Sequence, residues 1–259
     1  MGTMDDGGPV TGIQDVLARL AAVRADAIRR RSRVGYFAAV YVRITERVQA
    51  AIESRTFSDG KWIERLDVAF ATRYLDALHQ YQSAAPGAAP NSWDFAFRAA
   101  TRRTPIILQH ILLGINAHVN FDLGIATAGV VANFDELQTR QADFNKINQC
   151  AADEVRDLSS RLGAASPIIG AFGFFNGGAA NDRYANFGID ESREQAWLAA
   201  ELLTSLPHGQ VAEQERVLDR NATAVARLIL NPPGAIPELA LRLVRATELH
   251  SVRSVIKRL

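Results

Sequence analysis

Apolar residues recur at helical spacing along almost the whole chain. In the first such segment Ile13, Val16, Leu20 and Val23 are three or four positions apart, which is typical of one face of an α-helix. The same spacing recurs in further segments: 32–53, 61–82, 93–100, 105–128, 134–162, 191–206, 210–230 and about 238–257. No stretch alternates between apolar and polar residues for longer than four positions. The pattern therefore predicts an all-α fold, a bundle-like arrangement of several helices.

Residues typical of helix ends stand between these segments. Thr104 followed by Pro105 predicts an N-cap and a proline at the first position of the 105–128 helix. Asn133 with Glu136 three positions later resembles a capping box at the start of the next helix. Gly163 is expected to end that helix, and Asp190 is expected to cap the one that follows.

Stretches rich in small and turn-forming residues predict the loops. They are SAAPGAAPNS at 83–92 and GAFGFFNGGAANDRYANFG at 170–188, the second being long enough to suggest a functional loop. The polar, glycine-rich residues 1–10 predict a disordered N-terminus. Because nothing further along the chain resembles a linker, residues 11–259 are expected to form a single helical domain.

Charge and cysteine content narrow the range of partners. The chain has 29 Lys and Arg against 28 Asp and Glu, a net charge of +1, which argues against a nucleic-acid partner. Its single cysteine, Cys150, excludes an internal disulfide and a cysteine-based zinc site. The N-terminus shows no signal pattern, and no apolar run of 18 residues is free of polar ones. We therefore expect a cytoplasmic protein without a membrane role.

The 105–128 segment is apolar on all sides and yet contains several polar residues. On a helical wheel His118 and Asp122 share one face, whereas Gln109, Asn116 and Asn120 gather on nearly the opposite face. A helix that is apolar all round is surrounded by other helices, so both groups are expected to point into protein. The segment is thus the predicted central buried helix, and its polar residues need partners.

His118 and Asp122 are the best candidates for chemistry. At spacing i, i+4 their side chains can meet at one point, which suits a divalent metal ion or an acid–base pair in which the carboxylate orients the imidazole. A hydrogen-bonded pair without any chemistry fits the same spacing. For Asn116 and Asn120 two interpretations also stay open: register-fixing bonds to neighbouring helices, which we favour, or binding of a substrate.

Other segments offer residues that would complete such a site. Asp67 lies on the apolar face of its predicted helix, together with Phe70 and Tyr74, and an inward carboxylate needs a cation, a metal ion or several donors. It is our candidate for a third metal ligand or a second catalytic carboxylate. Arg193 and Trp197, one turn apart, are candidates for substrate binding, although a packed tryptophan flanked by an ion pair of Arg193 and Glu201 is the commoner interpretation of this pattern.

The chain resembles an uncharacterised, mostly bacterial family defined by a domain of unknown function. The resemblance is carried by LLGINAHVNFDL at 112–123, WIERLDVAFATRYLDAL at 62–78 and REQAW at 193–197. It implies no activity. INAHVNFDL also looks like the zinc-binding His-x-x-x-Asp helix of zinc-dependent phospholipases C and single-strand nucleases. The further histidines and the N-terminal tryptophan of those enzymes are missing, so at most one metal ion is expected.

Three functions are compatible with these residues. The first is a hydrolase with one divalent metal ion held by His118, Asp122 and Asp67, whose bound water attacks an ester or phosphoester. The second is a metal-free lyase or isomerase that acts on an apolar small molecule. The third is a non-enzymatic binding or interaction module, in which the buried polar residues only fix the register of the helices. Convergence of the three side chains on an open cavity would favour an enzyme.

Overall fold

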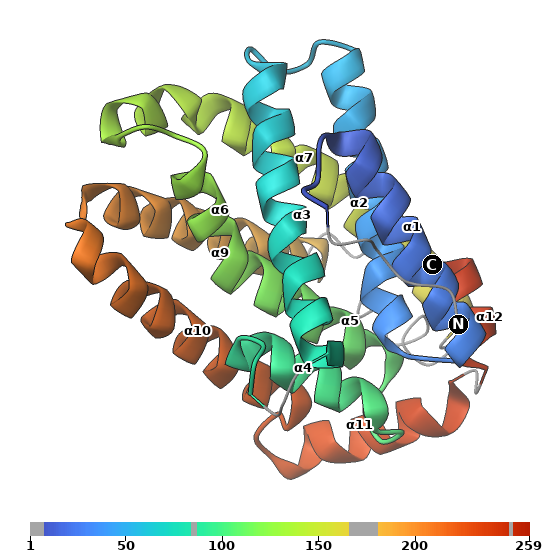
Figure 1. Ribbon diagram of the computed structural model, residues 1–259. Helices are drawn as coiled ribbons and strands as arrows, with labels where there is room; N and C mark the ends of the chain where they lie inside the picture. Colours follow the sequence, from blue (N-terminus) through green and yellow to red (C-terminus); the bar gives the residue numbers. More distant parts are fainter. Residues whose placement is uncertain (1–7, 84–86, 166–180, 249–250) are drawn as a thin grey trace.

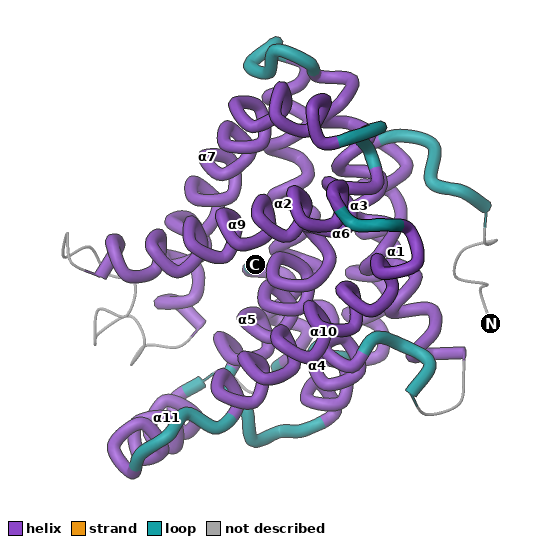
Figure 2. Tube along the Cα trace, turned by 90° about the vertical axis from the view of Figure 1, so that its left-hand side faces the viewer, coloured by secondary structure: helices purple, strands orange, loops and turns teal. Residues whose placement is uncertain are grey.

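The computed structural model describes residues 8–83, 87–165, 181–248 and 251–259, and there every regular element is a helix (Figures 1 and 2), which confirms the all-α prediction. The helices are α1 (Ile13–Arg30), α2 (Val34–Glu53), α3 (Gly60–Ser83), α4 (Asn91–Thr101), α5 (Ile107–Ala117), the π-helix η1 (His118–Leu123), α6 (Gly124–Gly129), α7 (Phe134–Ala165), α9 (Asn181–Ser205), α10 (His208–Leu230), α11 (Ala235–Thr247) and α12 (Val252–Arg258). The predictions for residues 1–7, 84–86 and 166–180 lie outside the described part of the chain.

The central helix is formed by α5, η1 and α6, which follow one another without a loop. It contacts α2, α3, α4, α9 and α10, so that it runs through the middle of the molecule (Figure 1). By length and composition Ile107–Gly129 could cross a membrane, but 72% of its most apolar stretch is buried inside the protein. Burial by five neighbouring helices is what the all-round apolar pattern predicts for a core helix.

The sequence pattern predicted a regular α-helix here. The structure differs, because η1 inserts a π-helical stretch at His118–Leu123. Such stretches are rare and often occur at functional sites. Neighbouring helices pack closely against the central helix just before and just after η1. A Cβ atom at Gly114 would lie 2.4 Å from Cγ of Phe37, and one at Gly124 would lie 2.8 Å from the carbonyl oxygen of Ala196. Only glycine lets α2 and α9 approach the helix this closely.

Several helix ends differ from the predictions made from local signals. The central helix begins at Ile107 instead of at Pro105, and the predicted last helix is divided into α11 and α12. Both differences involve Glu248, which follows α11 and accepts a hydrogen bond from the backbone N–H of Ile107 at 2.8 Å. Because α11 ends at Thr247, the Glu248 carboxylate lies at the N-terminus of α5, where a negative charge is favourable.

The predictions around α7 and α9 had mixed outcomes. The Asn133 side chain accepts a hydrogen bond from the Glu136 backbone N–H at 2.9 Å, which confirms the predicted cap. However, α7 continues to Ala165, beyond Gly163. Because α9 begins at Asn181, residues 181–188 of the predicted loop are helical, and Asp190 lies inside a helix instead of capping it. Local cap residues are only weak evidence when the flanking sequence also favours a helix.

Carboxylates from distant helices cap the N-termini of α3 and α4 in the same way. Asp143 of α7 accepts hydrogen bonds from the backbone N–H groups of Ser58 and Asp59 at 2.9 and 2.7 Å. Asp219 of α10 accepts from the backbone N–H groups of Asn91 and Ser92, both at 2.8 Å. These buried acids satisfy the otherwise unbonded first N–H groups of a helix and fix how the helices meet.

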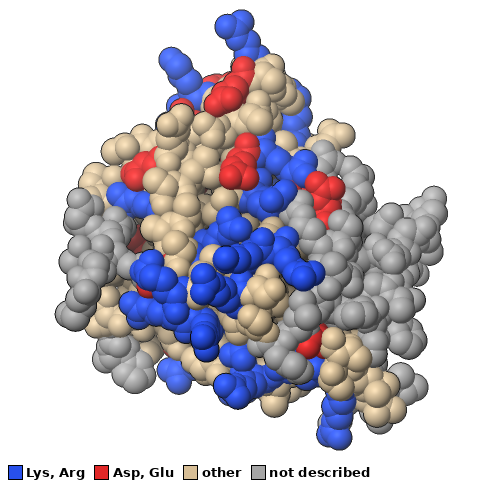
Figure 3. Space-filling view, turned by 90° about the vertical axis from the view of Figure 1, so that its right-hand side faces the viewer, with Lys and Arg blue, Asp and Glu red and all other residues tan. Residues whose placement is uncertain are grey.

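Charge is distributed unevenly over the surface. On the side of the molecule where α1, α11 and α12 lie in Figure 1, Lys and Arg side chains clearly outnumber Asp and Glu (Figure 3). The net charge of the whole chain is only +1, so this basic face could not be inferred from the charge count. Charges gathered in this way attract anions over several ångströms in spite of a small net charge.

Candidate functional site

His118 and Asp122 form a hydrogen-bonded pair inside η1. The His118 Nδ1 atom lies 3.2 Å from Oδ2 of Asp122, and the two residues are only 3% and 1% exposed. Because an ionised carboxylate can only accept, Nδ1 carries the proton and donates it to Asp122. The spacing i, i+4 therefore brings the side chains together as predicted, although the helix between them is a π-helix.

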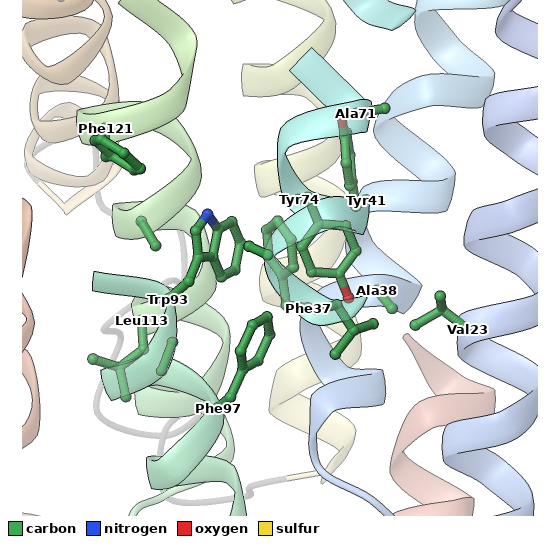
Figure 4. Close-up of a cluster of buried hydrophobic side chains, with 14 of the residues drawn as sticks. Val23, Phe37, Ala38, Tyr41, Ala71, Tyr74, Trp93, Phe97, Leu113 and Phe121 are labelled. Carbon is green, nitrogen blue, oxygen red and sulfur yellow. The ribbon is translucent and has the colours of Figure 1, made fainter. Parts of the chain in front are cut away.

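Asp122 has two further partners that the sequence analysis did not find. Arg73 of α3 donates from Nε to Oδ1 at 2.9 Å, and Trp93 of α4 donates from its indole N–H to Oδ2 at 2.7 Å. The indole nitrogen of Trp93 is turned towards the helix that carries Phe121 (Figure 4). Both carboxylate oxygens are thus engaged, and Asp122 joins three helices through charge-assisted hydrogen bonds.

The His118 ring is enclosed by aromatic side chains. It stacks on Phe70 with ring centroids 3.5 Å apart and an interplanar angle of 6°, and the edge of Tyr41 approaches it with centroids 4.5 Å apart. Burial lowers the pKa of His118, and the hydrogen bond from Nδ1 to Asp122 only partly opposes this effect. The lowered pKa favours the neutral imidazole. Its Nε2 atom is a lone-pair acceptor without a hydrogen-bond partner among the described residues.

Asp67 lies in a different environment from Asp122. It lines a small cavity of about 40 Å³ together with Tyr41, Phe70 and Arg193, where α2, α3 and α9 face one another. The Oδ2 atom of Asp67 and the hydroxyl of Tyr41 are buried and have no hydrogen-bond partner among the described residues. Burial, helped by the negative charge of Glu64, raises the pKa of Asp67 to about 7. Near neutral pH this carboxyl group can thus gain or lose a proton.

The structure does not bring Asp67, His118 and Asp122 together as three metal ligands. Asp122 already accepts hydrogen bonds at both oxygens, while Asp67 faces the cavity. Within the described residues, no three His, Cys, Asp or Glu side chains are placed to hold a metal ion. The predicted divalent metal site therefore has no support in the geometry of this part of the chain.

The amide side chains on the opposite face connect the central helix to α10. Asn116 donates to the carbonyl oxygen of Ala222 at 2.8 Å and accepts from Asn120 at 2.9 Å. Gln109 accepts from the backbone N–H of Ile106 and donates to the carbonyl oxygen of Ile229. These bonds are of the register-fixing kind. A substrate-binding role for Asn116 and Asn120 stays a prediction.

The two candidates in α9 differ in their position relative to the cavity. Arg193 lines it, and its guanidinium carbon lies 5.4 Å from the ring centroid of Phe144. Trp197 packs against Phe144 and donates to Glu201 at 2.9 Å, and it is not among the residues that line the cavity. Of the two candidates in α9, Arg193 alone lines the cavity that contains Asp67.

The family of this chain is decided by the region from α1 to the end of α10. A family model matches residues 13–232. The chain belongs to DUF5995, a family of unknown function. This confirms the resemblance to a domain of unknown function, whereas nothing supports the resemblance to zinc-dependent phospholipases C. No curated protein and no solved structure matches the chain.

The DUF5995 region contains the whole candidate site. Asp67, the pair of His118 and Asp122, and Arg193 all lie within residues 13–232. In contrast, Glu248 and the helices α11 and α12 follow the matched region. The cap on the central helix thus comes from a part of the chain outside the family match, while the cavity is built from the family region alone.

Proposed function

We propose that this member of DUF5995 is a metal-free enzyme that moves a proton on a small, largely apolar substrate, with Asp67 as the acid–base group. The observation that carries the proposal is the buried Oδ2 atom of Asp67, which has no partner among the described residues, in a cavity that Asp67 shares with Tyr41 and Arg193. An unpaired buried carboxyl group costs stability, so its presence needs another reason. Proton transfer is the chemistry that such a group serves best.

The reaction class follows from the three side chains. In its ionised form Asp67 removes a proton from a carbon atom next to a carbonyl group, and the electron pair of the C–H bond moves onto the carbonyl oxygen. Arg193 and the Tyr41 hydroxyl stabilise the resulting enolate oxygen. When the enolate is conjugated with a C=C bond, Asp67 returns the proton to the far end of that bond as the carbonyl group re-forms, which gives an isomerase. When the carbon next to the enolate bears a leaving group, the enolate pair forms a C=C bond, and the leaving group departs with its own bonding pair and takes the proton from Asp67, which gives a lyase.

The cavity limits what can react. Its volume of about 40 Å³ holds the reacting carbonyl end of a molecule, whereas complete small-molecule sites measure roughly 300–1,000 Å³. Its other lining residues include Ile44, Val48 and Leu66, so the neighbouring part of the substrate should be apolar. His118 has a positioning role in this scheme: its ring packs on Phe70 and Tyr41, two residues that line the cavity.

Hydrogen–deuterium exchange at carbon tests this function without knowledge of the true substrate. The full chain is incubated in D₂O with a panel of small ketones, aldehydes and enones, and deuterium in each compound is followed by NMR. We expect at least one compound to exchange faster with wild type than with Asp67→Asn. Glu64→Gln, which lowers the negative charge near Asp67 without removing the base, is the matched control and should retain exchange.

Two outcomes would overturn the proposal. One is equal exchange by wild type and Asp67→Asn for every compound, with both proteins folded by circular dichroism. The other is one equivalent of tightly bound metal in purified, untagged protein that is lost in His118→Ala and in Asp67→Asn. That result would restore the single-metal hydrolase, although the described residues do not bring its three predicted ligands together.

A non-enzymatic binding module is the second candidate function, and one observation favours it. Asp122 is sealed, and its two oxygens accept from Arg73, Trp93 and His118, as expected for a polar residue that fixes how the helices meet in a core. The exchange panel separates the two candidates, because a pure binding module produces no deuterium in any compound. Retained folding with no exchange would leave the module as the better description.

A further inference from the structure

Two adjoining cavities form a groove along α1: one lies between α1 and α3, which contact each other, and the other continues from it to the turn before α2 and to α4 (Figure 1). Their volumes are about 330 and 270 Å³, and they share Val23, Leu78 and Gln82 in their walls. Each is several times larger than the cavity at Asp67, and together they reach the size of a small-molecule site. We refer to them as the α1–α3 groove.

One end of the α1–α3 groove is basic. Arg30, Arg31 and Arg33 line it at the turn from α1 to α2. Asp26, the acid in the same wall, already accepts from Arg29 and Arg30. Neither Arg31 nor Arg33 makes an ion pair with a carboxylate in the described part of the chain. Arg33 donates to the carbonyl oxygen of Ala100. Burial and the nearby positive charge of Arg245 and Arg103 lower the pKa of Arg33, so a local anion would be favourable.

The other end of the groove is apolar. Ala18, Ala22 and Val23 of α1 face Leu75 and Leu78 of α3 across it. The two alanines leave the space that larger side chains would fill. Arg19 stands at the edge of this end and forms an ion pair with Asp15. An open apolar surface next to two arginines that form no ion pair with a described carboxylate is typical of a binding site.

We propose that the α1–α3 groove binds a free amphiphile: an apolar chain, seated between the alanines of α1 and Leu75 and Leu78, that ends in a carboxylate or phosphate held by Arg31 and Arg33. Guanidinium groups bind both anions through paired hydrogen bonds. From Ala18 to Arg30 the groove follows 12 residues of helix, about 18 Å at 1.5 Å per residue, which suits a long chain.

The groove is independent of the proposed proton-transfer site. The residues that line its two cavities and those that line the cavity at Asp67 have none in common. Failure of the amphiphile proposal would thus leave the acid–base proposal untouched, and the reverse also holds.

Calorimetric titration of the full chain with laurate, below its micelle concentration, tests the proposal. We expect saturable binding to wild type and at least a tenfold weaker affinity for the double variant Arg31→Gln, Arg33→Gln. Dodecanol, which has the same chain without a charge, should bind more weakly than laurate and equally to both proteins. Ala22→Phe should weaken both ligands, because the ring fills the apolar end of the groove.

Arg55→Gln is the matched control for the arginine variants. Both arginines follow a helix and have a positive φ, 55° at Arg31 and 57° at Arg55. Arg55 is exposed at the opposite end of α2, away from the groove. It should bind laurate like wild type. Dodecyl phosphate in place of laurate shows which head group is preferred, and anionic phospholipid vesicles show whether a membrane can supply it.

Three results would overturn the amphiphile site. The first is no saturable binding of laurate or dodecyl phosphate to folded wild type. The second is an affinity that falls equally in the double arginine variant and in Arg55→Gln, which would indicate general charge attraction. The third is unchanged binding in Ala22→Phe, which would place the chain elsewhere. Binding to vesicles without binding to either free amphiphile would likewise contradict the proposed occupant.

Discussion

Asp122 and Asp67 are both buried carboxylates beside the same aromatic core, and yet they have opposite surroundings. Asp122 accepts hydrogen bonds from Arg73, Trp93 and His118 and is 1% exposed. Asp67 is 8% exposed, and its Oδ2 atom has no partner among the described residues. The first carboxylate is part of what holds the helices together. The second weakens the fold at neutral pH, which is why we assign it a chemical role.

Other buried acids of the molecule resemble Asp122. Asp143, Asp219 and Glu248 each cap the N-terminus of a helix that is far away in the sequence. Among the described residues burial of an acid is therefore common, whereas a buried carboxylate oxygen without a partner is found at Asp67. The contrast shows that the number of donors around a buried carboxylate, more than its burial, separates a structural residue from a candidate catalytic one.

The largest effect is expected for Asp122→Asn. The amide replaces one acceptor by a donor that faces Arg73 or Trp93, and so it breaks at least one charge-assisted bond and leaves a donor unpaired. We expect the free energy of unfolding to fall by about 3 kcal/mol, as measured in urea, because broken buried ion pairs typically cost that much.

Glu213→Gln is the control for that measurement. Glu213 also pairs with two arginines, Arg216 and Arg220, but the side chains of all three are more than half exposed, so water screens the pairs. Its urea midpoint should not change. A midpoint of Asp122→Asn that also stays unchanged would remove Asp122 from the structural side of the comparison.

The next largest effect is expected for Asp67→Asn, and it should depend on pH. Since the pKa of Asp67 is raised from 3.8 to about 7, the native protein keeps a proton between these values that the unfolded chain has released. The contribution of this group to stability thus increases as the pH falls through 7. Asparagine is always neutral, so Asp67→Asn should be more stable than wild type by about 1–3 kcal/mol at pH 8.

The pH dependence of the difference is the decisive part. Towards pH 4 the two proteins should become equally stable, since protonated Asp67 is as neutral as asparagine. His110, whose pKa burial lowers to about 3, destabilises both proteins equally as the pH falls below 6.5, and it cancels in the difference. A stability difference that is the same at pH 5 and pH 8 would show that Asp67 is not titrating near neutral pH.

A smaller loss of stability is expected for Asn116→Ala. The change leaves the carbonyl oxygen of Ala222 without its donor and Asn120 without its acceptor, which should cost about 1–2 kcal/mol. Asn120→Ala removes only the second of these bonds and should cost less. Equal losses in the two variants, measured by urea unfolding, would mean that the bond to α10 contributes nothing and would strengthen a ligand role for the amides.

The sequence predicted the central helix and the two polar groups on it because both are local properties. The period of apolar residues shows that Ile107–Gly129 is buried, and the spacing i, i+4 brings His118 to Asp122 even though the π-helix of η1 alters the turn between them. The inward position of Asp67 followed in the same way from the apolar face of α3, and it is buried.

The partners of these residues could not be predicted, since they come from other helices. Arg73 and Trp93 are 49 and 29 positions away from Asp122, and periodicity says nothing about which helices meet. Glu248 ends α11 because it bonds to Ile107, 141 positions earlier, whereas its own neighbours favour a continuous helix. The predicted metal site had the same weakness: it assumed that Asp67 and Asp122 meet, and tertiary packing places each in a different environment.

The smallest effect on stability, and the sharpest distinction, is expected for Tyr41→Phe. The Tyr41 hydroxyl is buried without a partner among the described residues, so its removal takes away no hydrogen bond, and the urea midpoint should stay the same or rise slightly. If the proposed chemistry is right, deuterium exchange at carbon should nevertheless fall, because the enolate oxygen loses one donor. A clear loss of stability would instead show that the hydroxyl is bonded in solution and belongs with Asp122 among the structural groups.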